Sequence, residues 1–254
     1  MGTSRMTSKQ EWWSDFFSGL AVELWKHALS GEHTKSEVEF IRTMLQLSPG
    51  TKLLDVPCGL GRLTLELAVL ECELTGVDFS PHCLAEAKSA AARRNLNVRW
   101  EQRDMRNLPW SEEFDGAFCF GNSFGYLDDE GNAQFLKSIH RVLKHGARFI
   151  LDAPSVAENI IPHIEARTET QIGDILFIEE NRYDHVLGRL DTDYTIKRGE
   201  QIEKKFGSHR LYTYRQLEEL LAGAGFVKCT AYGSPNAEPY RFGSQGLIFV
   251  SEKN

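Results

Sequence analysis

Long apolar runs are missing from this sequence, and no stretch approaches the roughly 20 apolar residues that a membrane-spanning helix needs. The first residues, MGTSRMTSKQEWW, have no apolar centre of the kind found in signal peptides, and Met6 does not fit a myristoylation pattern. Cysteine is also scarce, with five residues in 254 and no CxxC pair. Scattered thiols are typical of a reducing compartment. We therefore expect a cytoplasmic protein without a membrane segment.

An excess of positive charge is equally absent. Lys and Arg number 29 against 36 Asp and Glu, which gives a net charge of −7 at pH 7. The basic pairs Arg93-Arg94 and Lys204-Lys205 are too short to form the clusters that bind phosphate backbones. The sequence therefore predicts no nucleic-acid partner. With 41% apolar and 26% charged residues, its composition is that of a globular protein.

Several catalytic motifs are missing as well. The sequence contains no HExxH motif, no cluster of His and Cys at metal-ligand spacing, and no Ser, His and Asp in an order that stands out as a triad. The acidic run Asp128-Asp129-Glu130 is best explained as the start of a helix, where negative charge is stabilising. We expect no metal ion.

The spacing of the apolar residues predicts helices and strands in alternation. One amphipathic helix is predicted over residues 11–29, and a second helix runs through 38–45 and ends at Pro49-Gly50. From Lys52 to Asp152, short apolar strands alternate with helices, which predicts a parallel, doubly wound α/β sheet with right-handed crossovers. The strands predicted in this region cover 52–56, 73–77, 98–102, 114–120 and 147–152.

The pattern changes in the second half of the chain. Residues 170–211 alternate between apolar and polar positions, with turns at Gly188 and Gly199, which predicts antiparallel hairpins inserted into the sheet domain. The helical spacing returns in residues 214–224. Two further strands are predicted at 225–227 and 246–251.

The segment Leu53–Leu63, LLDVPCGLGRL, carries the most chemical information. It runs from a predicted strand through a turn with Gly59 and Gly61 into a predicted helix. Ligands of open α/β sheets bind at the carboxyl ends of the strands, where glycines let them approach backbone N–H groups. Asp78 follows the next strand, 17 residues after Gly61, and a carboxylate there can accept both hydroxyls of a ribose. Together these features favour a nucleoside ligand over a purely structural turn.

Two residues narrow the identity of the nucleoside. A dinucleotide fingerprint requires Gly or Ala at the position of Thr64, so that the helix can pack closely on the strand. Asp55, which precedes the glycines, would repel a pyrophosphate but suit a cationic ligand. Both residues count against an NAD(P)-dependent oxidoreductase.

The sequence resembles the class I S-adenosylmethionine-dependent methyltransferases. Asp55–Gly61 is similar to the first motif of that family, and Gly76–Ser80 is similar to its second, with Asp78 as the ribose-binding acid. The resemblance covers residues 36–152 well and 211–252 in outline. Pro57 is a departure, because the family often has Gly at that position. Further similar segments are Arg103–Met105, Phe114–Ser123, Val142–Ala147 and Ala224–Phe226.

The resemblance implies a Rossmann-like, doubly wound, seven-stranded sheet with an inserted antiparallel β lid. On this basis the chain divides into three parts. They are an N-terminal helical cap (1–48), a methyltransferase domain (49–169 and 211–254), and an inserted β lid or substrate region (170–210).

The resemblance also implies S-adenosylmethionine as the cofactor and S-adenosylhomocysteine as its product. Asp104 would meet the adenine amino group and Met105 would line the adenine pocket. In relatives the N-terminal segment often covers the cofactor, which makes Trp13 a candidate. The predicted cofactor-binding residues are Asp55, Pro57, Cys58, Gly59, Gly61, Arg62, Asp78, Phe79, Asp104, Met105, Gly121, Asn122, Ser123 and Trp13.

The substrate side has no motif of its own. Tyr126 follows a strand at its carboxyl end, where ligands bind, and Phe17 belongs to the N-terminal segment. Arg210 and Arg241 would suit a substrate carboxylate, although surface ion pairs explain them equally well. The predicted substrate-binding residues are Phe17, Tyr126, Tyr183, Arg210 and Arg241. No catalytic base stands out, and the candidates are Tyr126 and His209.

We therefore predict an enzyme that transfers a methyl group to an oxygen or nitrogen of a small molecule by in-line displacement. Two alternatives stay open: a non-catalytic nucleoside- or cofactor-binding protein of the same fold, and an NAD(P)-dependent oxidoreductase. The sequence is compatible with a monomer or a homodimer.

Overall fold

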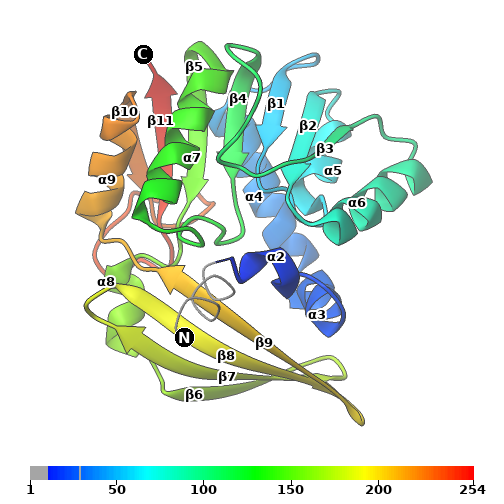
Figure 1. The fold of residues 1–254 in the computed structure, drawn as a ribbon. Helices are drawn as coiled ribbons and strands as arrows, with labels where there is room; N and C mark the ends of the chain where they lie inside the picture. Colours follow the sequence, from blue (N-terminus) through cyan, green and yellow to red (C-terminus); the bar gives the residue numbers. More distant parts are fainter. Residues whose placement is uncertain (1–10, 29) are drawn as a thin grey trace, which may run out of the picture.

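The fold is built on a seven-stranded mixed sheet, seen in a computed structural model that describes residues 11–28 and 30–254. The strand order is β10-β11-β5-β4-β1-β2-β3 (Figure 1). The strands from β5 to β3 run parallel, whereas β11 is antiparallel to both of its neighbours. The predicted α/β fold class is confirmed. The strands are β1 (Lys52–Asp55), β2 (Glu73–Asp78), β3 (Arg99–Gln102), β4 (Phe114–Cys119), β5 (Leu143–Asp152), β10 (Phe226–Tyr232) and β11 (Ile248–Lys253).

Helices cover both faces of this sheet. On one face, α7 (Asp129–Val142) packs on β5 and α9 (Tyr214–Gly223) packs on β10, and both helices belong to the first apolar cluster. On the other face, α4 (Gly31–Met44) packs on α5 (Arg62–Ala68), which lies against β2, and a second apolar cluster joins these helices to the sheet. Helix α6 (Pro81–Arg93) lies against β2, β3 and α5. Within the described residues, no helix is both long and apolar enough to cross a membrane.

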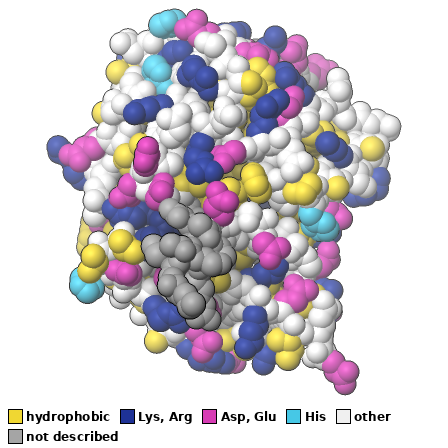
Figure 2. Space-filling view, in the orientation of Figure 1, with side chains coloured by type: hydrophobic (Ala, Val, Ile, Leu, Met, Phe, Trp, Pro, Cys, Tyr) yellow, Lys and Arg dark blue, Asp and Glu magenta, His cyan; other side chains and the backbone are white. Residues whose placement is uncertain are grey.

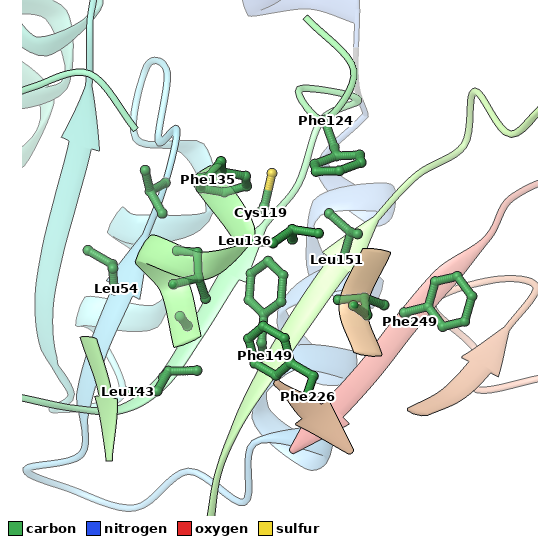
Figure 3. Packing of buried hydrophobic residues seen from close by; sticks show 14 of the residues in the cluster. Leu54, Cys119, Phe124, Phe135, Leu136, Leu143, Phe149, Leu151, Phe226 and Phe249 are labelled. Atoms are coloured by element: carbon green, nitrogen blue, oxygen red, sulfur yellow. The ribbon is translucent and has the colours of Figure 1, made fainter. Parts of the chain in front are cut away.

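Aromatic side chains fill the centre of the first cluster. Phe149 of β5 stacks on Phe226 of β10 with the ring centroids 5.5 Å apart, and it meets Phe135 of α7 edge to face (Figure 3). Phe135 and Phe149 are fully buried. Removing such a side chain from water contributes about 1.5–3 kcal/mol of stability, which explains why α7 is held firmly on the sheet.

Helices α6, α7 and α9 begin at side chains that cap their first turn. The Ser80 hydroxyl accepts a hydrogen bond from the Cys83 N–H at the start of α6, and the Asp128 carboxylate accepts one from the Gly131 N–H at the start of α7. Thr213 forms a reciprocal capping box with Gln216 at the start of α9. The prediction that the acidic run starts a helix is confirmed.

A separate four-stranded antiparallel sheet lies beyond the carboxyl ends of the parallel strands (Figure 1). Its order is β6-β7-β8-β9, formed by β6 (Arg167–Ile172), β7 (Ile175–Asp184), β8 (Arg189–Arg198) and β9 (Gln201–Arg210). The predicted hairpins are thus present. Two short helices before them, α8 (Ala157–Ile160) and the 3-10 helix η1 (Ile161–His163), were not predicted.

The N-terminal helix differs from the prediction of one continuous helix over 11–29. The chain forms α2 (Trp13–Phe16) and α3 (Leu20–Ala28), with Gly19 between them in the left-handed region at φ +59°. The Glu203 carboxylate of β9 accepts the Leu20 N–H at 2.9 Å. This contact from a distant strand starts α3 afresh, and helical spacing alone does not reveal it. The part of the predicted cap in residues 1–10 lies outside the described residues.

The second helix also ends earlier than predicted. Helix α4 stops at Met44 rather than at Pro49-Gly50, because Gln46 turns into the left-handed region at φ 55°. The Leu47 N–H then donates to the Arg42 carbonyl, which satisfies the end of the helix.

Helices α2 and α3 join the four-stranded sheet to the rest of the molecule. Phe16 and Leu20 pack against Phe177 of β7 in a third apolar cluster. The Trp12 indole N–H donates to the Ser208 carbonyl of β9 at 2.9 Å, and the Lys205 ammonium of the same strand donates to the Asp15 carbonyl. The N-terminal segment therefore packs on the inner face of the inserted sheet.

Trp100 of β3 lies across two glycines and holds the start of α5 close to β2. A Cβ placed on Gly61 would come within 2.8 Å of the Trp100 ring, and one on Gly76 would come within 2.6 Å. Gly61 also has φ +77° as the residue before α5. The glycine is required here for packing as well as for backbone conformation.

We expect Gly61→Ala to destabilise the fold more than Gly59→Ala. Both glycines have positive φ, which costs an alanine about 1–2 kcal/mol, but a Cβ at Gly59 meets no atom within 4 Å. The clash with Trp100 adds about 1–3 kcal/mol at Gly61. Urea unfolding of the two variants measures the difference. Equal losses would contradict this role of Trp100.

Candidate functional site

A cavity of about 900 Å³ lies between the two sheets. One wall is made by the segments that follow β1, β2, β3 and β4, and the opposite wall is made by the inner face of β7, β8 and β9. Helix α2 contributes Trp13 and Phe16. The volume is that of a site for small molecules, and it lies where ligands of open α/β sheets bind.

The loop after β1 is held by buried polar contacts. The Thr64 hydroxyl of α5 donates to the Asp55 carboxylate, which is 3% exposed. Burial raises the pKa of Asp55 to about 7, with the hydrogen bond from Thr64 opposing the shift. Thr64 is thus a partner of the acidic residue that begins the motif, which explains why this position is not Gly or Ala.

Asp78, at the end of β2, connects two strand ends. Its carboxylate accepts the Gly59 N–H at 2.8 Å through one oxygen and the Ser80 N–H at 2.8 Å through the other. Burial raises the pKa of Asp78 despite these bonds. Each carboxylate oxygen has a second lone pair, so the group can also accept the hydroxyls of a ligand in the cavity.

The same end of the cavity has an open cradle and polar groups without partners. Gly59 and Gly121 line it, and a Cβ on either would meet no atom within 4 Å. The Asn122 side-chain oxygen and the Trp13 indole N–H are buried without a hydrogen-bond partner among the described residues. Buried polar groups are normally satisfied, so these atoms fit a ligand with its own donors and acceptors.

Asp104 and Met105 lie in the loop after β3 and also line the cavity. Both oxygens of Asp104 accept hydrogen bonds from the Arg106 guanidinium, and the Arg106 N–H donates to one of them at 2.9 Å. Burial raises the pKa of Asp104, but the bonds from Arg106 outweigh it and the net shift is downward. Asp104 is therefore an ionised acceptor with part of its capacity already used.

The structure brings nearly all of the predicted cofactor-binding residues to this cavity. Gly61 is the one that does not line it, because Trp100 and Ala87 occupy the space beside its Cα. The predicted residues that line the cavity are Asp55, Pro57, Cys58, Gly59, Arg62, Asp78, Phe79, Asp104, Met105, Gly121, Asn122, Ser123 and Trp13.

The predicted substrate residues divide into two groups, and the first lines the cavity. Tyr126 contacts the Trp12 ring at a centroid distance of 4.7 Å and the His209 ring at 5.5 Å. Burial raises the pKa of Tyr126 and lowers that of His209 to about 4. At neutral pH the phenol is therefore protonated and the imidazole is uncharged. Phe17 also lines the cavity.

The second group, Tyr183, Arg210 and Arg241, does not line the cavity. The Arg210 guanidinium forms an ion pair with Asp129 at 2.9 Å and donates to the Leu211 carbonyl at 2.6 Å. Arg241 is exposed in the loop between β10 and β11. Of the two roles considered for Arg210, a substrate contact or an ion pair, the structure shows the ion pair.

Sequence reasoning missed several polar residues that line the cavity. Asp152 ends β5 at the same edge of the sheet as Asp55 and Asp78, a position that the strand pattern could have revealed. Glu179 and Thr192 lie in the inserted sheet and line the cavity. In this sheet only the strand register decides which side chains face inward. Among the described residues, no group of three His, Cys, Asp or Glu is arranged to hold a metal ion.

The fold and this cradle together define an α/β protein that binds a nucleoside cofactor. Residues 53–146 match the family model described as a methyltransferase domain. A protein of Geobacillus sp. (strain WCH70) that carries the name of a methyltransferase is 27% identical over 217 residues, or 80% of this chain and 84% of that protein.

Solved structures show the same fold. An S-adenosylmethionine-dependent methyltransferase from Clostridium acetobutylicum has a TM-score of 0.78 at 19% identity, covering 92% of this chain and 96% of that one. CalS10 from Micromonospora echinaspora, an amino pentose methyltransferase with S-adenosylmethionine bound, has a TM-score of 0.68 at 16% identity and covers 94% and 99%. Residues 53–146 thus match a methyltransferase domain, and the chain has the fold of S-adenosylmethionine-dependent methyltransferases.

We expect Asp78→Ala to weaken the binding of S-adenosylhomocysteine by about 1.5–3 kcal/mol, because a charge-assisted hydrogen bond to the ligand is lost. Calorimetric titration measures the affinity. Asp174→Ala, which removes an exposed acid paired with Arg198, is the control and should bind normally. Thermal unfolding of both variants is measured alongside, because Asp78 also holds its own loop. Unchanged affinity in a folded Asp78→Ala protein would rule out the assignment.

We expect Asp55→Asn to gain stability relative to the native chain as the pH rises from about 4 to 8. The folded chain holds the Asp55 proton up to about pH 7, whereas the unfolded chain releases it near pH 4. The contribution of Asp55 to the stability of the native chain, which is fully present below pH 4, is therefore lost as the pH rises through 7. The loss is on the order of a few kcal/mol. Unfolding at several pH values tests this. Parallel curves for the two proteins would show that Asp55 has an ordinary pKa.

Proposed function

We propose that this methyltransferase acts on an oxygen or nitrogen of a small molecule that enters the cavity between the two sheets. The cavity itself is the observation that carries the proposal, since its walls combine the cradle with a separate inserted sheet. S-adenosylmethionine supplies a methyl group already activated on a sulfonium, so the protein has to exclude water and align the acceptor.

Different residues at the cradle end of the cavity bind different parts of the cofactor. Asp78 accepts the ribose hydroxyls, while Asp104 and Met105 bind the adenine. Asn122 bonds the methionine part through its unpartnered oxygen. Trp13 and Phe79 meet edge to face with centroids 4.7 Å apart and form one wall over the site. The positive charge of the bound ligand favours the ionised form of Asp55, which then compensates that charge.

The inserted region 170–210 acts as a lid that selects the acceptor. Its inner face supplies Asn181, Thr192 and Tyr194 to the cavity, and α2 closes the side. Tyr126 and His209 are the residues that we assign to the acceptor, since their rings contact each other at the cavity wall. The amino pentose acceptor of the neighbour CalS10 supports a substrate of this size.

A nucleic-acid substrate fits the surface less well. Acidic and basic side chains are interspersed over the face in Figure 2, and the net charge of the chain is −7. Phosphate backbones are bound by concentrated positive charge, so a small acceptor is favoured. The five free cysteines support the cytoplasm as the compartment.

We expect the protein to transfer a labelled methyl group from S-adenosylmethionine to at least one member of a panel of small hydroxyl and amine compounds. Tyr126→Phe should lower the rate on that acceptor by about 10-fold or more if the hydroxyl positions it. Binding of S-adenosylhomocysteine should not change in this variant. Transfer to a protein or RNA but to no small molecule would overturn the proposal.

A further inference from the structure

The described residues that line the cavity include more carboxyl groups than basic groups. Two arginines line it, and both are already paired: Arg62 with the buried Glu37, and Arg103 with Glu101 at 2.9 Å. His209 is uncharged at neutral pH, because burial lowers its pKa. Among the described residues of the cavity wall, no arginine is therefore left unpaired for these carboxylates.

Asp152 is one of these carboxylates. It ends β5 beside the loop after β4 and accepts the Gly121 N–H at 3.1 Å. The charged groups that act on it are Glu37 and Arg62, which are paired with each other. Asp152 forms no ion pair with any described residue and lines the cavity at the cradle end.

Glu179 is the second, on the inner face of the inserted sheet. It accepts the Thr168 hydroxyl at 3.0 Å and forms no ion pair with a described residue. The next residue, Glu180, is exposed and pairs with Arg167 at 3.1 Å. The alternation of the strand thus separates a solvent-facing ion pair from a cavity-facing carboxylate without a cation.

Glu179 belongs to a polar strip on an otherwise apolar surface. Beside it, the Thr192 hydroxyl donates to the Asn181 side-chain oxygen at 2.7 Å, and both residues line the cavity. Further along the same sheet, Phe177 and Ile196 are covered by α2 and α3. The strip is therefore the part of the inserted sheet that is left for a polar ligand.

Resting on the proposed function, we propose that the acceptor is a small polar amine that enters as an ammonium ion, with Glu179 as its counter-ion. Removing a carboxylate from water is costly unless a cation compensates it, and a neutral hydroxyl supplies no charge. A sulfonium and an ammonium also repel each other in one cavity, so their joint binding requires carboxylates such as Asp152 and Glu179. Thr192 and Asn181 suit hydroxyl groups elsewhere on the same acceptor.

Methylation of an amine also requires the removal of one proton. The ammonium loses H⁺ to the Glu179 carboxylate that pairs with it, and the N–H electron pair stays on nitrogen. That pair forms the new N–C bond as the S–C bond breaks with its electrons left on sulfur. The proton that Glu179 receives then passes to solvent, which leaves an N-methylated product and restores the carboxylate.

The test compares pairs of compounds that differ only by an amine or a hydroxyl at one position, such as D-glucosamine and D-glucose. Each is titrated calorimetrically into the protein saturated with S-adenosylhomocysteine. We expect the amine of at least one pair to bind about 10- to 100-fold more tightly. Glu179→Gln should remove most of that preference, whereas Glu180→Gln, the matched change on the outer face, should keep it.

The labelled transfer assay on the same compounds separates this inference from the proposed function. Methyl transfer to the amines, with the label on nitrogen, is the expected result. Transfer to hydroxyl compounds alone would overturn the amine assignment and leave the proposed function intact. A lack of amine preference in every pair, or a preference that survives Glu179→Gln in a folded protein, would also overturn it. Binding of S-adenosylhomocysteine without transfer to any small molecule would count against the proposed function itself.

Discussion

The carboxylate of Asp78 is the contact on which the cradle depends. It bonds the Gly59 N–H after β1 and the Ser80 N–H before α6, so a single buried acid joins two strand ends and the start of a helix. Ser80 in turn caps α6 through the Cys83 N–H. A buried carboxylate is stable only where donors surround it, and here the donors belong to the backbone of the binding loop. The proposed cofactor site and the local fold therefore share one group.

The opposite wall of the cavity comes from the inserted sheet, which is held in place by different contacts. The inserted sheet buries Phe177 and Ile196 in one apolar cluster with α2 and α3, and it is tied to them by the Trp12 and Lys205 hydrogen bonds. Polar residues further along its inner face, such as Glu179 and Thr192, line the cavity. This arrangement leaves the cradle unchanged when the acceptor side varies, which fits a fold that serves many substrates.

Sequence reasoning worked best where one strand or one turn carries the information. The strands after Lys52, the capping role of Asp128 and the loop from Asp55 to Gly59 depend on local spacing and turn chemistry. It failed where a distant residue intervenes. Glu203 accepts the Leu20 N–H, and a new helix starts there. Asp129 forms an ion pair with Arg210, whose guanidinium does not line the cavity.

The sequence by itself determined the doubly wound sheet, the glycine loop and the acid that follows the next strand, because strand ends of a parallel sheet always meet at one edge. Only the tertiary structure decided which residues from distant parts of the chain line the cavity together. Asp152, Glu179 and Tyr126 are far apart in the chain, and all three line that cavity. The register of the inserted hairpins and the break at Gly19 decide which side chains turn inward. A shift of one residue would turn Glu180 inward in place of Glu179.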